Sequence, residues 1–61
     1  MKIRTYKSTQ DGQWYWHARA DNGRIVADSG EGYHNKGDML QELNNVREQI
    51  GSAQVVEDEA A

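Results

Sequence analysis

The chain has 61 residues, of which 36% are hydrophobic and 28% are charged, and its formal net charge is −3. The absence of cysteine excludes disulfides, thiolate zinc sites and a cysteine nucleophile. A chain of about 60 residues buries only about 60% of its unfolded surface, so it is marginally stable without staples or partners. We therefore expect one small folding unit that needs a second copy of itself.

The start of the chain does not resemble a targeting segment. The residues after Met1 and Lys2 alternate between apolar and polar, and no apolar run approaches the about 20 residues of a membrane span. We expect a soluble cytoplasmic protein with no membrane partner.

The first half of the chain has the two-residue periodicity of β-strands. Strands are predicted over residues 2–7, 13–21 and 24–29. Between them, Asp11-Gly12 and Asn22-Gly23 predict two-residue type I′ turns. Across the first hairpin, such turns would pair Ile3 with Ala20, Thr5 with Ala18, Tyr6 with His17 and Lys7 with Trp16. Across the second hairpin, they would pair Ala20 with Ile25, Ala18 with Ala27 and His17 with Asp28. A longer first loop would shift the first register by two residues.

This register divides the strand residues between two faces of a sheet. The face expected to be covered collects Ile3, Thr5, Trp14, Trp16, Ala18, Ala20, Ile25 and Ala27. The face expected to be open collects Arg4, Tyr6, Tyr15, His17, Arg19, Val26 and Asp28. The open face is the first place to look for a partner.

A helix is predicted after the irregular segment 30–34, with Asn35 as its N-cap and Gly51 at its C-terminal end. Its apolar stripe is Met39, Leu40, Leu43, Val46 and Ile50, which is expected to cover the sheet. Residues 53–57 are short and β-branched, as in a fourth strand. The predicted domain is 1–57, followed by an acidic flexible tail over 58–61.

Catalytic, metal and cofactor chemistry find little support in the residues. Asp28 could orient His17 as a general base, but no hydroxyl has an evident place beside them, which favours a solvated His–Asp pair. Two histidines without a third convergent ligand make a weak metal site. The Gly30-Glu31-Gly32 segment lacks the further residues of a phosphate-binding loop. We expect no enzyme activity, no cofactor, no metal and no small-molecule ligand.

Charge is distributed unevenly along the chain. Residues 1–30 carry five basic and three acidic side chains, a net +2, whereas residues 31–61 carry two basic and seven acidic, a net −5. The basic strand half, with its exposed aromatic side chains, could bind a single-stranded nucleic acid. The low isoelectric point of about 5.1 disfavours that interpretation. The same asymmetry would equally serve self-association.

Several of these segments together resemble a known family. They are Trp14-Tyr15-Trp16, Asn22-Gly23, the run Ile25 to Tyr33 with its Ser-Gly-Glu-Gly-Tyr stretch, and Lys36 before an amphipathic helix. From about Ile3 to Val56 the chain resembles the YegP-like family of small uncharacterised proteins, of which it contains a single repeat. The resemblance implies a three-strand, helix, strand unit, with two units joined in one sheet by exchange of their C-terminal strands. It implies no established enzymatic activity.

The sequence thus predicts an α+β fold of three antiparallel strands, one amphipathic helix and one C-terminal strand. The leading hypothesis is a non-enzymatic homodimer of structural or interaction function, with Ala53, Val55 and Val56 in the dimer interface. The alternative is a single-stranded nucleic-acid or protein-binding adaptor that uses Arg4, Tyr6, Tyr15, His17 and Arg19.

Overall fold

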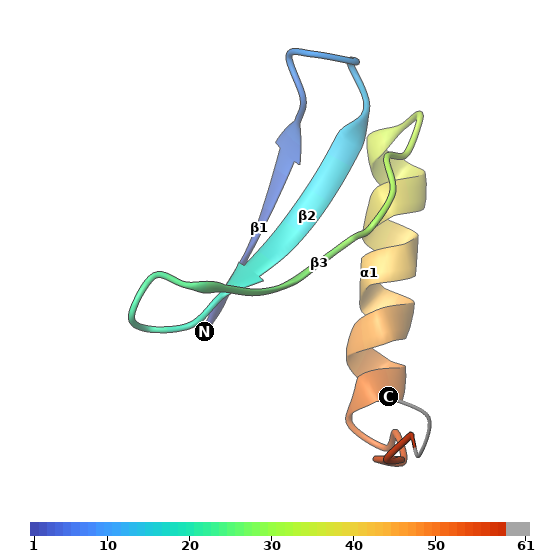
Figure 1. Cartoon of the computed structure of the whole chain (residues 1–61). Coiled ribbons are helices and arrows are strands. Elements are labelled where there is room, and N and C mark those ends of the chain that lie inside the picture. The colour runs from blue at the N-terminus through green and yellow to red at the C-terminus, as the bar shows by residue number, and fades with distance from the viewer. Residues whose placement is uncertain (59–61) are drawn as a thin grey trace.

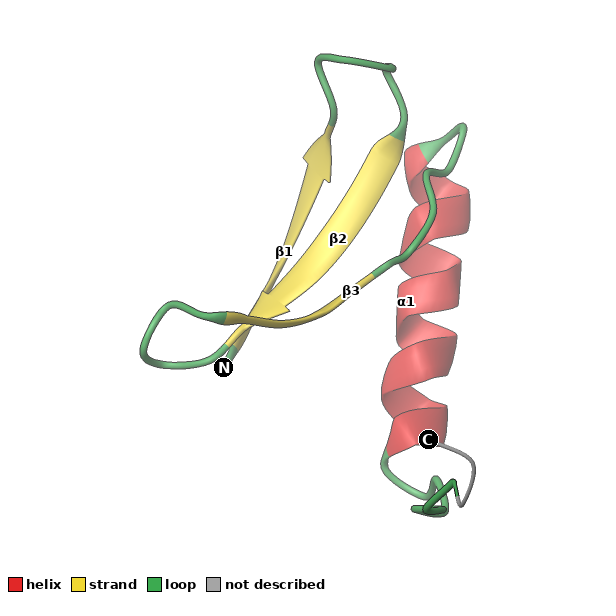
Figure 2. Cartoon of the chain, in the orientation of Figure 1, coloured by secondary structure: helices red, strands yellow, loops and turns green. Residues whose placement is uncertain are grey.

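The computed structural model describes residues 1–58 and arranges them in two layers, a sheet and a helix (Figure 1). The elements are β1 (Lys2–Lys7), β2 (Trp14–Arg19), β3 (Ile25–Asp28) and α1 (Lys36–Ile50). The strands form one antiparallel sheet in the order β1-β2-β3, which makes β2 the centre and leaves β1 and β3 as edges (Figure 2). The predicted α+β class, with three antiparallel strands and one helix, is confirmed.

The first hairpin uses the longer loop. Residues 9–12 form it, closed by bonds from the Ser8 N–H to the Gln13 carbonyl (2.8 Å) and from the Gly12 N–H to the Ser8 carbonyl (3.0 Å). A type I′ turn requires positive φ at both central residues, but only Gly12 has it, with φ of 71°. The prediction of a two-residue turn is therefore wrong, and Thr5 faces Trp16 instead of Ala18. Because the shift is two residues, every side chain of β1 and β2 keeps its predicted face.

The second hairpin also departs from a type I′ turn. The Gly23 N–H donates to the Ala20 carbonyl, and the Ala20 N–H donates to the Arg24 carbonyl, both at 2.9 Å. This is a three-residue loop that ends in a left-handed glycine, with Gly23 at φ 89°. The register then shifts beside Ala18, which leaves Val26 as an extra residue on β3.

The predicted pairs of this second hairpin are confirmed only on one side of the bulge. Ala18 faces Ala27 and His17 faces Asp28, as expected. Ile25 faces Arg19 rather than Ala20, because the three-residue turn displaces the register by one residue, and the bulge at Val26 restores the predicted register beyond it. The prediction that Ile25 lies on the covered face is therefore wrong, since it shares a face with Arg19.

The Ser-Gly-Glu-Gly-Tyr segment extends β3 along β2 rather than leaving the sheet at once. The Ser29 N–H donates to the Trp16 carbonyl (3.0 Å), and Tyr33 and Trp14 exchange two backbone bonds of 2.8 and 2.9 Å. Gly32 passes so close to β2 that a Cβ there would lie 2.2 Å from Gln13 Oε1 and 2.7 Å from the Tyr15 hydroxyl. A side chain at position 32 would therefore require the Gln13 and Tyr15 side chains to move.

Asn35 caps the helix as predicted. Its Oδ1 accepts from the Asp38 N–H at 2.8 Å, and its Nδ2 donates to the Asp38 carboxylate at 3.0 Å. The helix ends at Ile50, as expected. Gly51 follows with φ of −64°, so the end of the helix does not use a left-handed glycine at this position.

The core lies between α1 and the central strand. It consists of Trp16, Met39 and Leu43, with Trp14, Tyr33 and Val46 packed around them. Among the strands, α1 contacts only β2.

Several residues predicted to be covered are therefore exposed. They are Ile3, Thr5, Ile25 and Ala27 on the edge strands and Leu40 and Ile50 on the helix. Sheet twist, increased locally by the bulge at Val26, turns the edge strands away from a single straight helix. The far end of the helical stripe lies beyond the buried cluster, where Ile50 is 68% exposed.

The fourth strand predicted over residues 53–57 is not formed in the single chain. The chain turns after the helix, where the Ala53 N–H donates to the Ile50 carbonyl at 3.2 Å. The segment that follows, up to residue 58, pairs with no other strand. Val55 is 98% and Val56 71% exposed. A strand exists only when another strand accepts its backbone bonds, and this segment pairs with neither edge of its own sheet. Of the predicted tail 58–61, residues 59–61 lie outside the described part of the chain.

Candidate binding face of the sheet

Five of the residues expected on the open face share one face of the sheet: Arg4, Tyr6, Tyr15, His17 and Arg19. Asp28 pairs with His17 on that face, whereas Val26 is the extra residue of the bulge and has no partner on β2. Three successive cross-strand pairs, at alternate positions, are Tyr6–Tyr15, Arg4–His17 and Lys2–Arg19. Alternate residues of a strand point to the same side, and Trp16, of the opposite parity, is buried against α1. We call the surface formed by these six side chains the open face: Lys2, Arg4, Tyr6, Tyr15, His17 and Arg19.

One end of the open face is aromatic. The rings of Tyr6 and Tyr15 are stacked, with centroids 5.8 Å apart and planes 18° apart, and the Tyr6 and His17 centroids are 5.4 Å apart. The Tyr15 hydroxyl donates to the Asp11 carboxylate. That hydrogen bond lowers the pKa of Asp11 and raises the pKa of Tyr15. The first-hairpin loop therefore holds the phenol in place.

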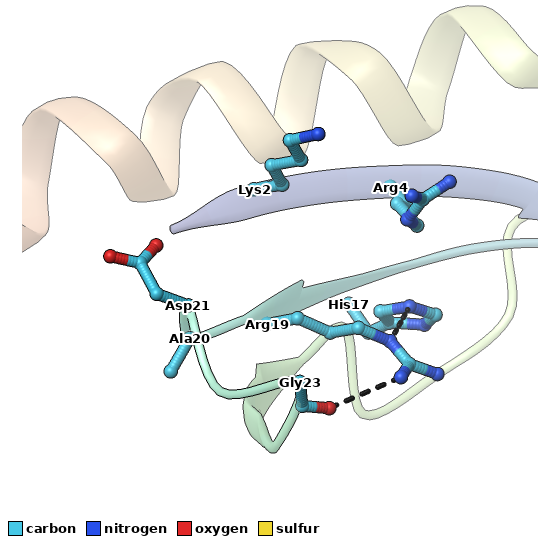
Figure 3. A pocket seen from close by; sticks show the side chains of 7 residues that line it. All are labelled: Lys2, Arg4, His17, Arg19, Ala20, Asp21 and Gly23. Atoms are coloured by element: carbon cyan, nitrogen blue, oxygen red, sulfur yellow. Dashed lines mark hydrogen bonds between the residues drawn. The ribbon is translucent and has the colours of Figure 1, made fainter.

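The other end of the open face is basic and hollowed. A hollow of about 610 Å³ is lined by Lys2, Arg4, His17, Arg19, Ala20, Asp21 and Gly23 (Figure 3). Arg19 is held by two bonds, from Nε to His17 Nε2 (3.2 Å) and from Nη1 to the Gly23 carbonyl (3.1 Å). A guanidinium has five N–H donors, so three remain for a ligand.

The cations of the hollow have no carboxylate partner. Among residues 1–58, the one ion pair joins the Met1 ammonium to Asp21, at 2.9 Å. Asp28, opposite His17, instead accepts from the Gly30 N–H at 2.9 Å. Lys2, Arg4 and Arg19 thus give this face a local positive charge although the chain carries −3.

The predicted His17–Asp28 pair is present as neighbours across the strands but not as a hydrogen-bonded pair. His17 Nε2 accepts from Arg19, and Asp28 bonds to the Gly30 backbone. In the described residues these two side chains share no hydrogen bond. A general base needs an orienting partner, and Asp28 does not orient His17 in this arrangement.

The sequence interpretation missed Lys2, Ala20, Asp21 and Gly23 as members of the hollow, and it placed Ala20 on the covered face. Lys2 has the same strand parity as Arg4 and could have been included on that signal alone. Gly23 could not, because its carbonyl meets Arg19 only through the three-residue turn.

A three-stranded antiparallel sheet with one helix over its central strand defines a small α+β domain. Residues 9–57 match the family model described as "Domain of unknown function (DUF1508)", and the chain belongs to that family. DUF1508 is the designation of the YegP-like family, so the family resemblance is supported. The family description indicates no enzymatic activity.

A solved structure of a similar protein shares this fold over nearly the whole chain. It is the NMR solution structure of a protein from Haloferax volcanii, 32% identical, with a TM-score of 0.80 and 93% of each chain covered. No curated protein matches the sequence. Within residues 1–58, no helix combines the length and apolar character needed to cross a bilayer; the cytoplasmic location stays a prediction.

Proposed function

We propose that the protein is a non-enzymatic homodimeric module, structural or interacting in function, in which residues 53–57 of each copy add a strand to the partner's sheet. The observation that carries the proposal is an apolar segment without cover. Val55 and Val56 belong to the most exposed apolar side chains of the molecule, and they follow the helix without a pairing partner.

The surface area of the single chain supports a missing partner. Its accessible surface is 5244 Å². A folded monomer of 6.9 kDa exposes about 4,000 Å², so the excess is roughly 1,200 Å². The radius of gyration is 13.5 Å, against about 10.5 Å for a compact chain of this length. An interface of ordinary size buries about 800 Å² on each partner, which this excess can supply.

The edge of β1 is the better acceptor for the added strand. All six of its residues are exposed and its pairing with β2 is regular, so its outer edge presents an unbroken row of backbone groups. The edge of β3 is four residues long and interrupted by the bulge at Val26. A strand on β1 would also cover Ile3, whose side chain is 40% exposed on the helix side of the sheet.

Sedimentation equilibrium at micromolar concentration tests the dimer. We expect a mass of about twice 6.9 kDa. Val55→Asp should convert it to a destabilised monomer, because the charge would be buried in the joined sheet. Ser52→Asp adds the same charge before the predicted strand and should leave the mass unchanged. A wild-type chain that sediments as a folded monomer would overturn the proposal.

The exchange itself needs a measurement that distinguishes chains. In a dimer mixed from isotope-labelled and unlabelled copies, nuclear Overhauser contacts between the Val55 methyls of one copy and β1 of the other should be observed. A dimer that lacks these contacts would retain self-association but contradict strand exchange.

A further inference from the structure

We infer that the open face binds single-stranded nucleic acid, with phosphates in the basic hollow and a base stacked at the tyrosine end. This goes beyond the proposed dimer and does not depend on it, because every residue involved lies within one chain. A strand added at the edge of β1 would also leave this face uncovered.

The basic hollow provides the phosphate contacts. Arg19 is fixed by His17 and by the Gly23 carbonyl before any ligand arrives, so little side-chain entropy is lost when its free N–H groups bind. Arg4 and Lys2 add two more cations to the same hollow, and the structure pairs neither with a carboxylate. Figure 3 shows the ends of Arg4 and Arg19 extending to the same side, away from Asp21.

The tyrosine end provides the stacking surface. Tyr6 is 42% exposed and is backed by Tyr15, whose hydroxyl is tied to Asp11. An exposed ring held by a second ring is a rigid platform, and bases stack on such platforms with little regard to sequence. Tyr6 and Lys2 are four residues apart on β1, or roughly 13 Å at about 3.3 Å per residue.

The acidic half of the chain does not oppose this interaction. Glu42 and Glu48 lie on α1, which packs against the opposite face of β2. Asp21, the carboxylate at the hollow, is engaged by the Met1 ammonium at 2.9 Å. Two further carboxylates lie at this face: Asp28, opposite His17, accepts from the Gly30 N–H, and Asp11 accepts from the Tyr15 hydroxyl. The three cations Lys2, Arg4 and Arg19 outnumber these two, so the net charge that a strand meets on the open face is positive. An acidic peptide would satisfy the cations but would leave Tyr6 without a planar partner, which favours nucleic acid over a protein ligand.

A fluorescence-anisotropy titration with a labelled oligothymidylate of about 12 nucleotides tests the inference. Three phosphate contacts predict a slope of about −2 for log affinity against log salt, or roughly 20-fold weaker binding between about 50 and about 200 mM salt. Arg19→Gln should reduce the slope by about 0.7. Arg47→Gln removes the same charge from the helix and should leave slope and affinity unchanged.

The stacking contact is tested by substitution of Tyr6. Tyr6→Leu keeps an apolar side chain but removes the ring, and should weaken binding roughly ten-fold or more. Tyr6→Phe keeps the ring and should retain the affinity. Thermal unfolding of each variant confirms that it is folded.

Three outcomes would overturn the inference. The first is no binding at about 50 mM salt. The second is equal loss of affinity in Arg19→Gln and Arg47→Gln, which would indicate general charge rather than this hollow. The third is displacement of the oligonucleotide by polyglutamate at the same concentration of charges, which would make the hollow a site for acidic protein segments.

Discussion

The two faces of β2 show how one short strand serves two purposes. Trp14, Trp16 and Ala18 point toward α1, and the last two are buried; Tyr15, His17 and Arg19 point away and none is buried. The helix side is stabilised by apolar packing around Met39. The open side is organised by stacking and by hydrogen bonds from Tyr15 and Arg19. A small sheet can therefore leave one face free for binding only because the other face supplies its core.

A second difference runs along the helix. Met39 and Leu43, in its first half, are buried, whereas Ile50 at its end is exposed. The single chain completes its core at one end of the helix only.

The largest effect is expected from Met39→Ala, which tests whether the helix side holds the fold. Met39 has no exposed surface, and its truncation should cost about 2–5 kcal/mol. A small domain rarely has more than about 5 kcal/mol of stability, so the variant should be largely unfolded. Urea denaturation followed by tryptophan fluorescence measures the change. Leu40→Ala, the next residue but 38% exposed, should cost far less; equal losses would contradict the difference between the two sides of the helix.

An intermediate effect is expected at the junction between the sheet and the helix. Gly32→Ala places a methyl group 2.2 Å from Gln13 Oε1 and 2.7 Å from the Tyr15 hydroxyl. Such overpacking should cost about 1–3 kcal/mol. At Gly37, the nearest atom to a new Cβ is Asn35 Oδ1, at 3.5 Å. Gly37→Ala in α1 should therefore stabilise by up to about 1 kcal/mol. Chemical denaturation of the two variants should show opposite signs, and a loss of stability in both would contradict this packing.

The smallest effect is expected on the open face, in the Asp11–Tyr15 hydrogen bond. The bond raises the pKa of Tyr15 and lowers the pKa of Asp11. Its stabilisation is therefore present between their unfolded pKa values, about 3.9 for Asp and about 10 for Tyr. It is lost as pH rises through the folded pKa of Tyr15 or falls through that of Asp11.

An NMR titration of the tyrosine rings measures this directly. Asp11→Asn should lower the pKa of Tyr15. The pKa of Tyr33 is raised mainly by burial, so it should stay unchanged and serves as the internal control. A Tyr15 pKa that does not respond to Asp11→Asn would show that the hydrogen bond is not formed in solution.

Much of the candidate site could be predicted because strand parity is a local property. The alternation in residues 2–7 and 14–19 assigns each side chain to a face, and a register shift of two residues preserves that assignment. Five of the six open-face residues were predicted in this way; Lys2 completes the set.

The sequence by itself determined the three strands, the helix with Asn35 as its cap, and the separation of apolar and polar residues, because each depends on residues close together in the chain. Only the tertiary structure decided the register of both hairpins, the bulge at Val26 and the exposure of Ile25 and Ile50. These depend on turn geometry and on which strand the helix contacts, and such non-local packing has no signature in a short run of residues. For the same reason, residues 53–57 contain two β-branched valines and still form no strand in the single chain, because no edge of a sheet accepts their backbone hydrogen bonds.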